Sequence, residues 1–346
     1  MNQWKVPFLL AIVSIMMFCL GCSLAREKAG RLTPIQRVET ESLPGSRTIA
    51  PYRFIAFGDW GAGTQFQKDV AKQTILQYEK APFDAALLLG DNFYETGDVR
   101  KYGKAYFSDM YRPLIDHHVN FIVALGNHDV LTGHQKEQIE FFGMPGYYYT
   151  VHKPQIDFFV INTNTFARDR VQRQWLQLQL MESKAPWKIV MGHEPIYSSG
   201  EHGYSTSLHE TLEPVLIKNK VDLYLAGHDH DYERFQLIHG IQYIVSGGGG
   251  AYLRGFPKLM PESLVRKKVH HFLSFELNQG TLRLQVIDKT GQTIDQAQWT
   301  KPQQGRLETD LRPTGTEKQP VYSTTHPLPI TTKRKTSLNA SKKREE

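Results

Sequence analysis

The stretch AALLLGDNFY, residues 85–94, contains the pattern that decides the fold: an apolar run that ends in a glycine and a carboxylate. Its first half, 85–89, has the length and composition of a buried strand. Gly90 permits a tight turn, and Asp91 then stands at the carboxyl end of that strand. Ligands of open α/β folds bind at this edge of the sheet. The stretch therefore predicts an α/β fold with a functional carboxylate at the sheet edge.

The same arrangement occurs four more times along the chain. Apolar runs at 54–57, 121–125, 189–191 and 223–226 each precede a short polar motif. These motifs are Gly58-Asp59-Trp60, Gly126-Asn127-His128-Asp129, Gly192-His193-Glu194 and Gly227-His228-Asp229-His230. Each alone has an ordinary explanation, such as a turn or a helix N-cap. Five in succession, all supplying oxygen or nitrogen ligands, predict one metal site.

The residue types favour a pair of cations. Asp59 and Asp91 are hard oxygen donors, and a carboxylate can bridge two cations about 3.5–4 Å apart, as in two-metal hydrolases. Asn127 adds an oxygen donor without adding charge. Imidazole nitrogens come from His193, His228 and His230. The last two are two residues apart, so in an extended segment they point the same way and can serve different metals.

The remaining pattern indicates helices between the strands and a strand-rich second half. Apolar residues recur at helical spacing in 65–80, 169–183 and 207–219. After Asp231 the pattern predicts strands at 235–239, 242–245, 272–277 and 282–287. Gly280 and Gly291 stand where antiparallel turns are expected, and Gly247 to Gly250 form a four-glycine turn.

The order of these motifs resembles that of the calcineurin-like metallophosphoesterases, and Tyr94 narrows the resemblance to the purple acid phosphatases. Gly58-Asp59-Trp60-Gly61, the GDNFYETG stretch at 90–97 and Glu201-His202-Gly203 are similar to the small, tartrate-resistant type. The resemblance covers about residues 52–250. It implies a four-layer α/β/β/α sandwich, whereas the residues themselves indicate only an α/β first half and a strand-rich second half.

The resemblance also implies the ligands of a dinuclear centre. The first metal is expected on Asp59, Asp91, Tyr94 and His230, and the second on Asp91, Asn127, His193 and His228. The expected metals are Fe(III) in the first position and Fe(II), Zn(II) or Mn(II) in the second. A phenolate is a hard anionic donor that suits a trivalent ion, and such an ion acidifies its bound water. Alternatively, Tyr94 packs beside a site for two divalent ions.

The reaction implied by the resemblance is hydrolysis of phosphate monoesters by a metal-bound hydroxide. Protonation of the leaving group is expected from His128 and His202, carried over from the family, with Glu201 orienting or assisting. The plainer alternatives are that His128 only fixes the loop of Asn127 and that His202 is a solvated loop residue. Asp129 is expected to orient a histidine rather than to bind metal.

Other functions are compatible with the same motifs. A phosphodiesterase or nucleotide pyrophosphohydrolase would use the same metals with a different pocket. A non-catalytic surface binding protein on a degenerate fold is disfavoured, because every metal-ligand position of the pattern is filled. A redox role for a mixed-valence iron pair is the third alternative, and activity of a zinc-loaded, iron-free protein would count against it.

The amino-terminal segment predicts export. Lys5 precedes the apolar run 6–20, which is short for a membrane span and typical of a signal peptide, so residues 1–25 are assigned to one. Ser23-Leu24-Ala25 suits ordinary cleavage, whereas Cys19-Leu20-Gly21-Cys22 resembles a bacterial lipobox with an unusual Cys19. The protein is thus expected to be periplasmic, secreted, or anchored to the outer membrane as a lipoprotein through Cys22.

Three further segments follow the signal peptide: a linker at 26–50, a catalytic domain at 51–300 and a basic tail at 301–346 that is expected to be disordered. The tail has ten Lys or Arg and five Asp or Glu, so it carries +5 of the formal +6 and leaves the rest at +1. The body is therefore almost neutral and predicts no nucleic-acid binding. The expected partners are small phosphorylated substrates, and the tail either is simply solvated or holds the protein near anionic lipid or cell-wall polymer.

Overall fold

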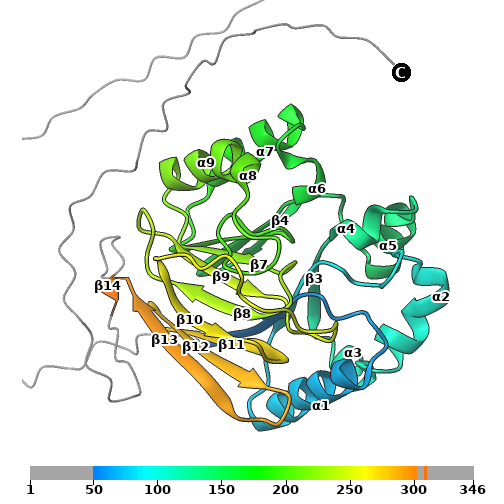
Figure 1. Cartoon of the computed structure of the whole chain (residues 1–346). Coiled ribbons are helices and arrows are strands. Elements are labelled where there is room, and N and C mark those ends of the chain that lie inside the picture. The colour runs from blue at the N-terminus through cyan, green and yellow to red at the C-terminus, as the bar shows by residue number, and fades with distance from the viewer. Residues whose placement is uncertain (1–49, 302–307, 310–346) are drawn as a thin grey trace, which may run out of the picture. The chain divides into compact units, whose positions relative to one another are not determined.

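The computed structural model describes residues 50–301 and 308–309, which fold around two seven-stranded mixed sheets (Figure 1). The strands of the first sheet are β1 (Tyr52–Phe57), β2 (Ala85–Leu89), β3 (Asn120–Ala124), β11 (His271–Asn278), β12 (Thr281–Asp288), β13 (Thr293–Thr300) and β14 (Glu308–Thr309). Their order across the sheet is β14-β13-β12-β11-β1-β2-β3.

The second sheet also has seven strands, and four of them are parallel to one another. Its strands are β4 (Tyr149–Lys153), β5 (Ile156–Val160), β6 (Trp187–Met191), β7 (Leu223–Ala226), β8 (Tyr232–Phe235), β9 (Gln242–Ser246) and β10 (Ser263–Lys267). Their order is β10-β8-β9-β7-β6-β5-β4. Within it, β5, β6, β7 and β9 are parallel, as β1, β2 and β3 are in the first sheet.

The helices are short except for two. They are α1 (Gln65–Lys80), α2 (Val99–Gly103), the π-helix η1 (Lys104–Ser108), α3 (Arg112–Asp116), α4 (Asn127–Val130), α5 (Gln135–Phe142), α6 (Thr163–Phe166), α7 (Arg170–Glu182), α8 (Thr206–Thr211) and α9 (Glu213–Lys218). Figure 1 shows α1 and α3 on the outer side of the first sheet and α7, α8 and α9 on the outer side of the second.

Two apolar clusters hold the layers together. Between the sheets, the ring of Phe54 lies edge-on to Phe158 at 5.1 Å and is stacked on Phe275 at 4.7 Å. On the outer side of the second sheet, Leu176 and Leu180 of α7 are buried with apolar residues of α8, α9, β7 and β9. Burial of such large side chains is the main favourable term in folding. The four-layer sandwich implied by the resemblance is confirmed.

Most of the predicted elements occur, and two differ. The helix expected at 207–219 is broken at Leu212, because Pro214 lies in the first turn of α9, where its missing N–H costs nothing. The strand expected at 235–239 is wrong, since β8 ends at Phe235. A tight turn follows, in which His239 and Gly240 have positive φ between the bridged residues Ile238 and Ile241.

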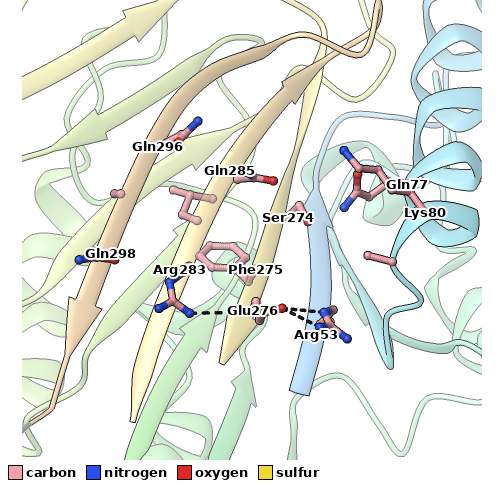
Figure 2. Close-up of a pocket in the computed structure, with 13 residues that line it drawn as sticks. Arg53, Gln77, Lys80, Ser274, Phe275, Glu276, Arg283, Gln285, Gln296 and Gln298 are labelled. Carbon is pink, nitrogen blue, oxygen red and sulfur yellow. Dashed lines mark hydrogen bonds and ion pairs between the residues drawn. The ribbon is translucent and has the colours of Figure 1, made fainter. Parts of the chain in front are cut away.

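Part of the outer face of the first sheet is polar and hollowed. A cleft of about 620 Å³ lies there between α1 and the antiparallel strands, as Figure 2 shows. The side chain of Glu276 lies between two arginines, 2.7 Å from Arg53 and 3.6 Å from Arg283. Along β12, Arg283 and Gln285 are exposed, whereas the alternating residues Leu282, Leu284 and Val286 are buried in the core. This alternation is that of a sheet with one solvated face.

The predicted signal peptide and linker lie outside the described residues, apart from Ala50. Of the predicted tail, the structure describes Lys301, whose ammonium lies 2.6 Å from the carboxylate of Asp222, and Glu308–Thr309, which pair with β13. Among the residues with described positions, no helix has the length and apolar character needed to cross a bilayer.

Acid should destabilise the fold through His271, a fully buried residue of β11. Its Nε2 lies 2.9 Å from the hydroxyl of Ser246, and its Nδ1 donates to the carbonyl of Val269 at 2.9 Å. Burial lowers the pKa of His271 to about 4. Because the unfolded chain takes up this proton near pH 6.5, stability present above that pH is lost as the pH falls toward 4, by about 3 kcal/mol.

Urea unfolding of the wild type and of His271→Gln at pH 7 and pH 4.5 measures this loss. We expect the variant to lose less stability on acidification than the wild type does. The exposed His239, replaced in the same way, is the matched control and should leave the pH dependence unchanged. Equal pH dependence of wild type and His271→Gln would contradict the assignment.

Candidate metal centre

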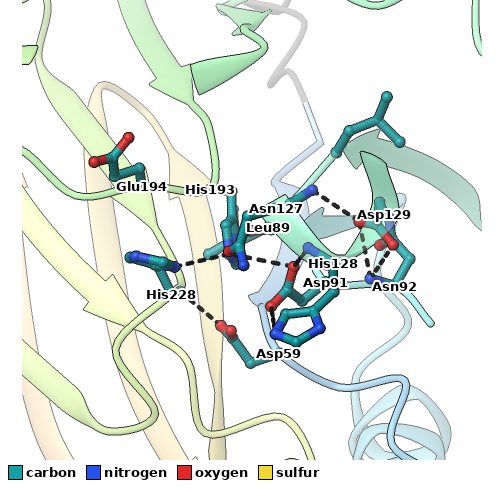
Figure 3. A network of polar contacts seen from close by, with 12 residues as sticks. Asp59, Leu89, Asp91, Asn92, Asn127, His128, Asp129, His193, Glu194 and His228 are labelled. Atoms are coloured by element: carbon teal, nitrogen blue, oxygen red, sulfur yellow. Dashed lines mark hydrogen bonds and ion pairs between the residues drawn. The ribbon is translucent and has the colours of Figure 1, made fainter. Parts of the chain in front are cut away.

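The five predicted motifs meet at one place, where the carboxyl ends of β1, β2 and β3 face those of β6 and β7. Figure 3 shows the side chains that follow these strands gathered around the carboxylates of Asp59 and Asp91. Both carboxylates and the imidazole of His193 are almost completely buried. Ligand atoms of Asp59, Asp91 and His230 all lie within 4.8 Å of one another. The topology thus brings together residues that are up to 171 positions apart, from 59 to 230.

Three of the four residues expected on the first metal, Asp59, Tyr94 and His230, are in mutual contact, and Asp91 lies beside them. The hydroxyl of Tyr94 donates to Oδ1 of Asp59 at 3.0 Å and lies 3.1 Å from Nε2 of His230. The same Nε2 is 3.3 Å from Oδ1 of Asp59. Nδ1 of His230 donates to the carbonyl of Tyr252 at 2.8 Å, which leaves Nε2 available as a ligand.

The residues expected on the second metal form an adjacent group. Nε2 of His193 lies 3.0 Å from Oδ1 of Asn127, 3.2 Å from Nδ1 of His228 and 3.4 Å from Oδ1 of Asp91. Nδ1 of His193 donates to the carbonyl of Leu89 at 2.9 Å, so this imidazole also turns its free nitrogen inward. Asp91 lies in both groups, which is the position of a bridging ligand.

Three of these residues have backbone angles that favour glycine. The φ angles of Asp59, Asp91 and His228 are 57°, 51° and 72°. Such left-handed conformations are uncommon outside glycine and collect at functional sites. The condition of an extended segment is therefore not met at His228. The two imidazoles nevertheless reach different groups, because the turned backbone directs His228 toward His193 and His230 toward Asp59.

The glycines that precede the motifs leave room for the carboxylates. A Cβ on Gly126 would stand 2.1 Å from Oδ1 of Asp91, and one on Gly227 would stand 2.4 Å from Oδ2 of Asp59. Real Cβ atoms do not approach so closely, so any side chain here must displace a predicted ligand.

We therefore expect Gly126→Ala to lower the metal content of the purified protein by at least one ion per chain while leaving the fold intact. Gly255→Ala is the matched control, because a Cβ there meets nothing within 4 Å. Elemental analysis together with circular dichroism separates loss of metal from loss of fold. Full metal occupancy in Gly126→Ala would show that the motif glycine is dispensable.

The charges of the centre fit a bound cation. Burial lowers the pKa of His193, but the carboxylates of Asp91 and Asp59 outweigh it and raise this pKa to about 10. Burial, with the charges of His193 and His202, lowers the pKa of His228 to about 2. Burial and the same two carboxylates raise the pKa of Tyr94 well above its ordinary value. A cation beside them would replace the proton on His193 and allow Tyr94 to ionise, so the donor set fits a metal pair.

The predicted proton donors lie beside the centre in different surroundings. Nδ1 of His128 donates to the carbonyl of Glu95 at 2.7 Å, and its Nε2 lies 4.0 Å from Oδ2 of Asp91. The ring of His202 stacks on that of His228, with centroids 3.9 Å apart, and its Nε2 contacts the guanidinium of Arg254. Glu201 is half exposed and forms an ion pair with Arg254 at 3.8 Å.

The role expected for Asp129 is wrong in one respect: its carboxylate accepts from backbone and amide groups rather than from a histidine. It accepts from the backbone N–H of Asn92 at 2.9 Å, of Phe93 at 3.2 Å and of Gly126 at 2.7 Å. The side chain of Asn92 donates to it as well, at 3.0 Å. Asn92 thus connects the loops that follow β2 and β3.

Asp229 was not singled out by the sequence, although it stands between two predicted ligands. Its carboxylate accepts from Ser198 Oγ and from the backbone N–H groups of His202 at 2.9 Å and Gly203 at 3.3 Å. It thereby ties the loop that carries His202 to the segment that carries His228 and His230. Its place inside the Gly-His-Asp-His motif is the only signal that could have identified it.

Comparison with known sequences supports the family implied by the motifs. The calcineurin-like phosphoesterase family matches residues 52–232. Tartrate-resistant acid phosphatase type 5 of Homo sapiens is 32% identical over 254 residues, which are 62% of this chain and 78% of the relative. Purple acid phosphatase 7 of Arabidopsis thaliana is 27% identical over 289 residues, covering 72% of this chain and 86% of the relative.

Two solved structures share the architecture. GAP50, described as the anchor in the inner membrane complex of Plasmodium, has a TM-score of 0.65 at 25% identity, covering 71% of this chain and 87% of that one. Purple acid phosphatase PPD1 from yellow lupin also has a TM-score of 0.65, at 21% identity, covering 72% of this chain and 53% of that one. The lupin likeness concerns the fold alone.

Proposed function

The chain belongs to the calcineurin-like phosphoesterase family, and on this premise we propose that it hydrolyses phosphate monoesters at a dinuclear metal centre under acidic conditions. The observation that supports this most directly is the sharing of Asp91 between two groups of ligands. Its oxygens lie near His193 on one side, while its carboxylate clusters with Asp59 and His230 on the other. The names of the relatives agree with the proposal.

The two ligand groups are proposed to hold different metals. Asp59, Tyr94 and His230 would hold Fe(III) with Asp91, while Asn127, His193 and His228 would hold Fe(II), Zn(II) or Mn(II) with the same Asp91. This follows from the hard phenolate that Tyr94 offers to one group alone. When bound, the metal pair supplies positive charge for the phosphate oxygens and lowers the pKa of a bound water.

The chain's own residues orient the ligands and handle protons. The backbone N–H of His128 donates to Oδ1 of Asp91 at 3.0 Å, and the backbone N–H of His228 donates to Oδ2 of Asp59 at 2.8 Å. These bonds fix both carboxylates. We propose that Nε2 of His128 delivers the proton to the leaving oxygen, because its Nδ1 is already held by Glu95.

Hydrolysis of 4-nitrophenyl phosphate from pH 4 to 9, with iron supplied during expression, tests the proposal. We expect a maximum below pH 7, because a strongly charged metal pair keeps its water ionised in acid. Activity on bis(4-nitrophenyl) phosphate that exceeds monoester activity would instead favour the phosphodiesterase alternative. Absence of both activities in a protein with two bound metals would overturn the hydrolase proposal.

The alternative of a non-catalytic binding protein has one observation in its favour, the likeness to GAP50, which is described as an anchor. The complete ligand set argues against it for this chain. The redox alternative is tested with protein that is loaded with zinc instead of iron. Activity of this zinc-loaded, iron-free protein would exclude a requirement for mixed-valence iron.

We also propose that the protein is exported and anchored through Cys22, on the strength of its amino-terminal sequence. Fractionation of cells that express the wild type or Cys22→Ala measures the anchor. Release of the variant from the membrane fraction is expected, and a variant that stays membrane-bound would contradict lipid attachment at this residue.

A further inference from the structure

The segment after the four-glycine turn is tied to the metal centre through its backbone. The carbonyl of Tyr252 accepts from Nδ1 of His230 at 2.8 Å, and the backbone N–H of Arg254 donates to the carbonyl of His230 at 3.1 Å. These two bonds fix residues 252–254 against a predicted metal ligand. The backbone at Arg254 is therefore held by the centre itself, although no sequence motif marks this residue.

The guanidinium of Arg254 lies one imidazole away from the second ligand group. It contacts Nε2 of His202, and the ring of His202 stacks on His228 with centroids 3.9 Å apart and an angle of 25°. The side chain of Arg254 is 29% exposed, so it is reachable from solvent. A permanent positive charge thus stands next to an imidazole that is stacked on a residue of the second ligand group.

Most of the hydrogen-bonding capacity of this guanidinium is unused among the described residues. The contact with His202 takes one of five N–H groups. The ion pair with Glu201 is 3.8 Å long, beyond hydrogen-bond distance, and Glu201 is 54% exposed. Such a solvated pair stabilises the fold little and is readily replaced by a better acceptor.

A second cation, Lys258, is bonded to the loop that carries Glu201 and His202. The ammonium of Lys258 donates to the carbonyls of Glu201 at 2.6 Å and His202 at 2.9 Å. These bonds hold the loop of His202 against the segment that carries Arg254. Asp229 also holds this loop, by accepting from the backbone N–H of His202. The loop of His202 is therefore held in place beside two cations, Arg254 and Lys258, with the carboxylate of Glu201 next to them.

We propose that Arg254 forms a subsite for a second anionic group next to the scissile phosphate, so that the preferred substrates are diphosphates such as nucleoside diphosphates. A guanidinium matches two phosphate oxygens with parallel N–H groups, which makes it selective for such a group. This inference rests on the proposed function, since it names the substrate class of the same site.

The reaction on a nucleoside diphosphate balances with water alone. The oxygen of water bonds to the terminal phosphorus, and the bond from that phosphorus to the bridging oxygen breaks. The bridging oxygen leaves with its electron pair on the nucleoside monophosphate, whose charge Arg254 meets. The products are the monophosphate, inorganic phosphate and one proton, so no oxidant, reductant or further reactant is needed.

The test compares ADP with AMP as substrates of the metal-loaded full chain, in wild type, Arg254→Gln and Arg254→Lys. We expect Arg254→Gln to lower the ratio of kcat/KM for ADP to that for AMP by about tenfold, and Arg254→Lys to lower it less, since lysine keeps the charge but not the fork. Arg266→Gln removes a charge from the exposed strand β10 and should leave the ratio unchanged. A ratio that changes by less than threefold in Arg254→Gln overturns the proposal.

A binding measurement separates this inference from the proposed function. Calorimetry with α,β-methylene-ADP, whose bridge resists hydrolysis, should show about tenfold weaker binding to Arg254→Gln than to wild type, with a smaller change for inorganic phosphate. If wild type hydrolyses neither ADP nor AMP, this difference in binding still tests the subsite, while 4-nitrophenyl phosphate tests the proposed function. Equal losses for the analogue and for phosphate would mean that Arg254 serves phosphate binding in general, which contradicts a second subsite.

Discussion

Replacement of Asp91 by alanine should lower kcat/KM for 4-nitrophenyl phosphate by at least about 10³-fold, which corresponds to about 4 kcal/mol of transition-state stabilisation. Asp91 is 1% exposed and lies in both ligand groups. Burial opposes its charge, but His193 and His128 outweigh burial and hold its pKa well below the ordinary range. The carboxylate is thus ionised, and available to two cations, over the pH range of the assay.

The loss should be visible in metal content as well as in rate. Elemental analysis is expected to find fewer than two ions per chain in Asp91→Ala. Asp91→Asn keeps the shape of the side chain but removes its charge, so its metal content should lie between those of Asp91→Ala and the wild type. Asp109→Ala removes a surface carboxylate that is paired with Lys104 and serves as the control. Wild-type activity in Asp91→Ala would contradict the shared-ligand arrangement and, with it, the dinuclear centre.

The strand-and-motif units were predictable because their signals are local. In 85–94, five apolar residues, a glycine and a carboxylate follow one another in the chain. In the structure, β2 spans the predicted residues 85–89. That the five motifs meet in space follows from one rule, the position of ligands at the carboxyl edge of parallel strands. This rule covers the motifs within each sheet, whereas the division into two ligand groups around Asp91 was implied by the family resemblance.

The elements that escaped prediction lack a local signal. Strand β13, Thr293–Thr300, has only one fully buried apolar residue, Trp299, so its pattern is weak. The helices α2, α3, α4 and α6 have four or five residues, too few for helical spacing to be detected. Strand β10 is largely exposed and is placed by its pairing with β8. Tertiary contacts decide these segments.

The same limit applies to the residues around the site. Asp129 accepts from Asn92, which is 37 positions away, and that partner cannot be read from the Gly-Asn-His-Asp motif. Arg254 lies in an irregular segment and becomes notable only when its contact with His202 is seen. Sequence motifs therefore identify the candidate ligands of the cations. The groups that hold the loops, such as Asp129, and those beside the centre, such as Arg254, are identified only from the fold.

Replacement of His128 by glutamine should reduce kcat for an alkyl phosphate by about 10²- to 10⁴-fold, the usual contribution of general acid catalysis. His128 is held by Glu95 through Nδ1, with its ring 4.6 Å from that of Tyr94, so that Nε2 is the nitrogen left to face a substrate. An alkoxide is a strong base and leaves slowly without a proton. A nitrophenolate leaves readily without one, so kcat for 4-nitrophenyl phosphate should fall much less.

The contrast between the two substrates distinguishes a proton donor from a residue that only fixes the loop. A structural role predicts equal losses for alkyl and nitrophenyl esters, because misplaced ligands slow both. His202→Gln is the matched variant: its Nε2 is already engaged with Arg254, so it should show a small and nearly equal effect on the two esters. A larger contrast in His202→Gln than in His128→Gln would reverse the assignment and make the imidazole stacked on His228 the donor to the leaving oxygen.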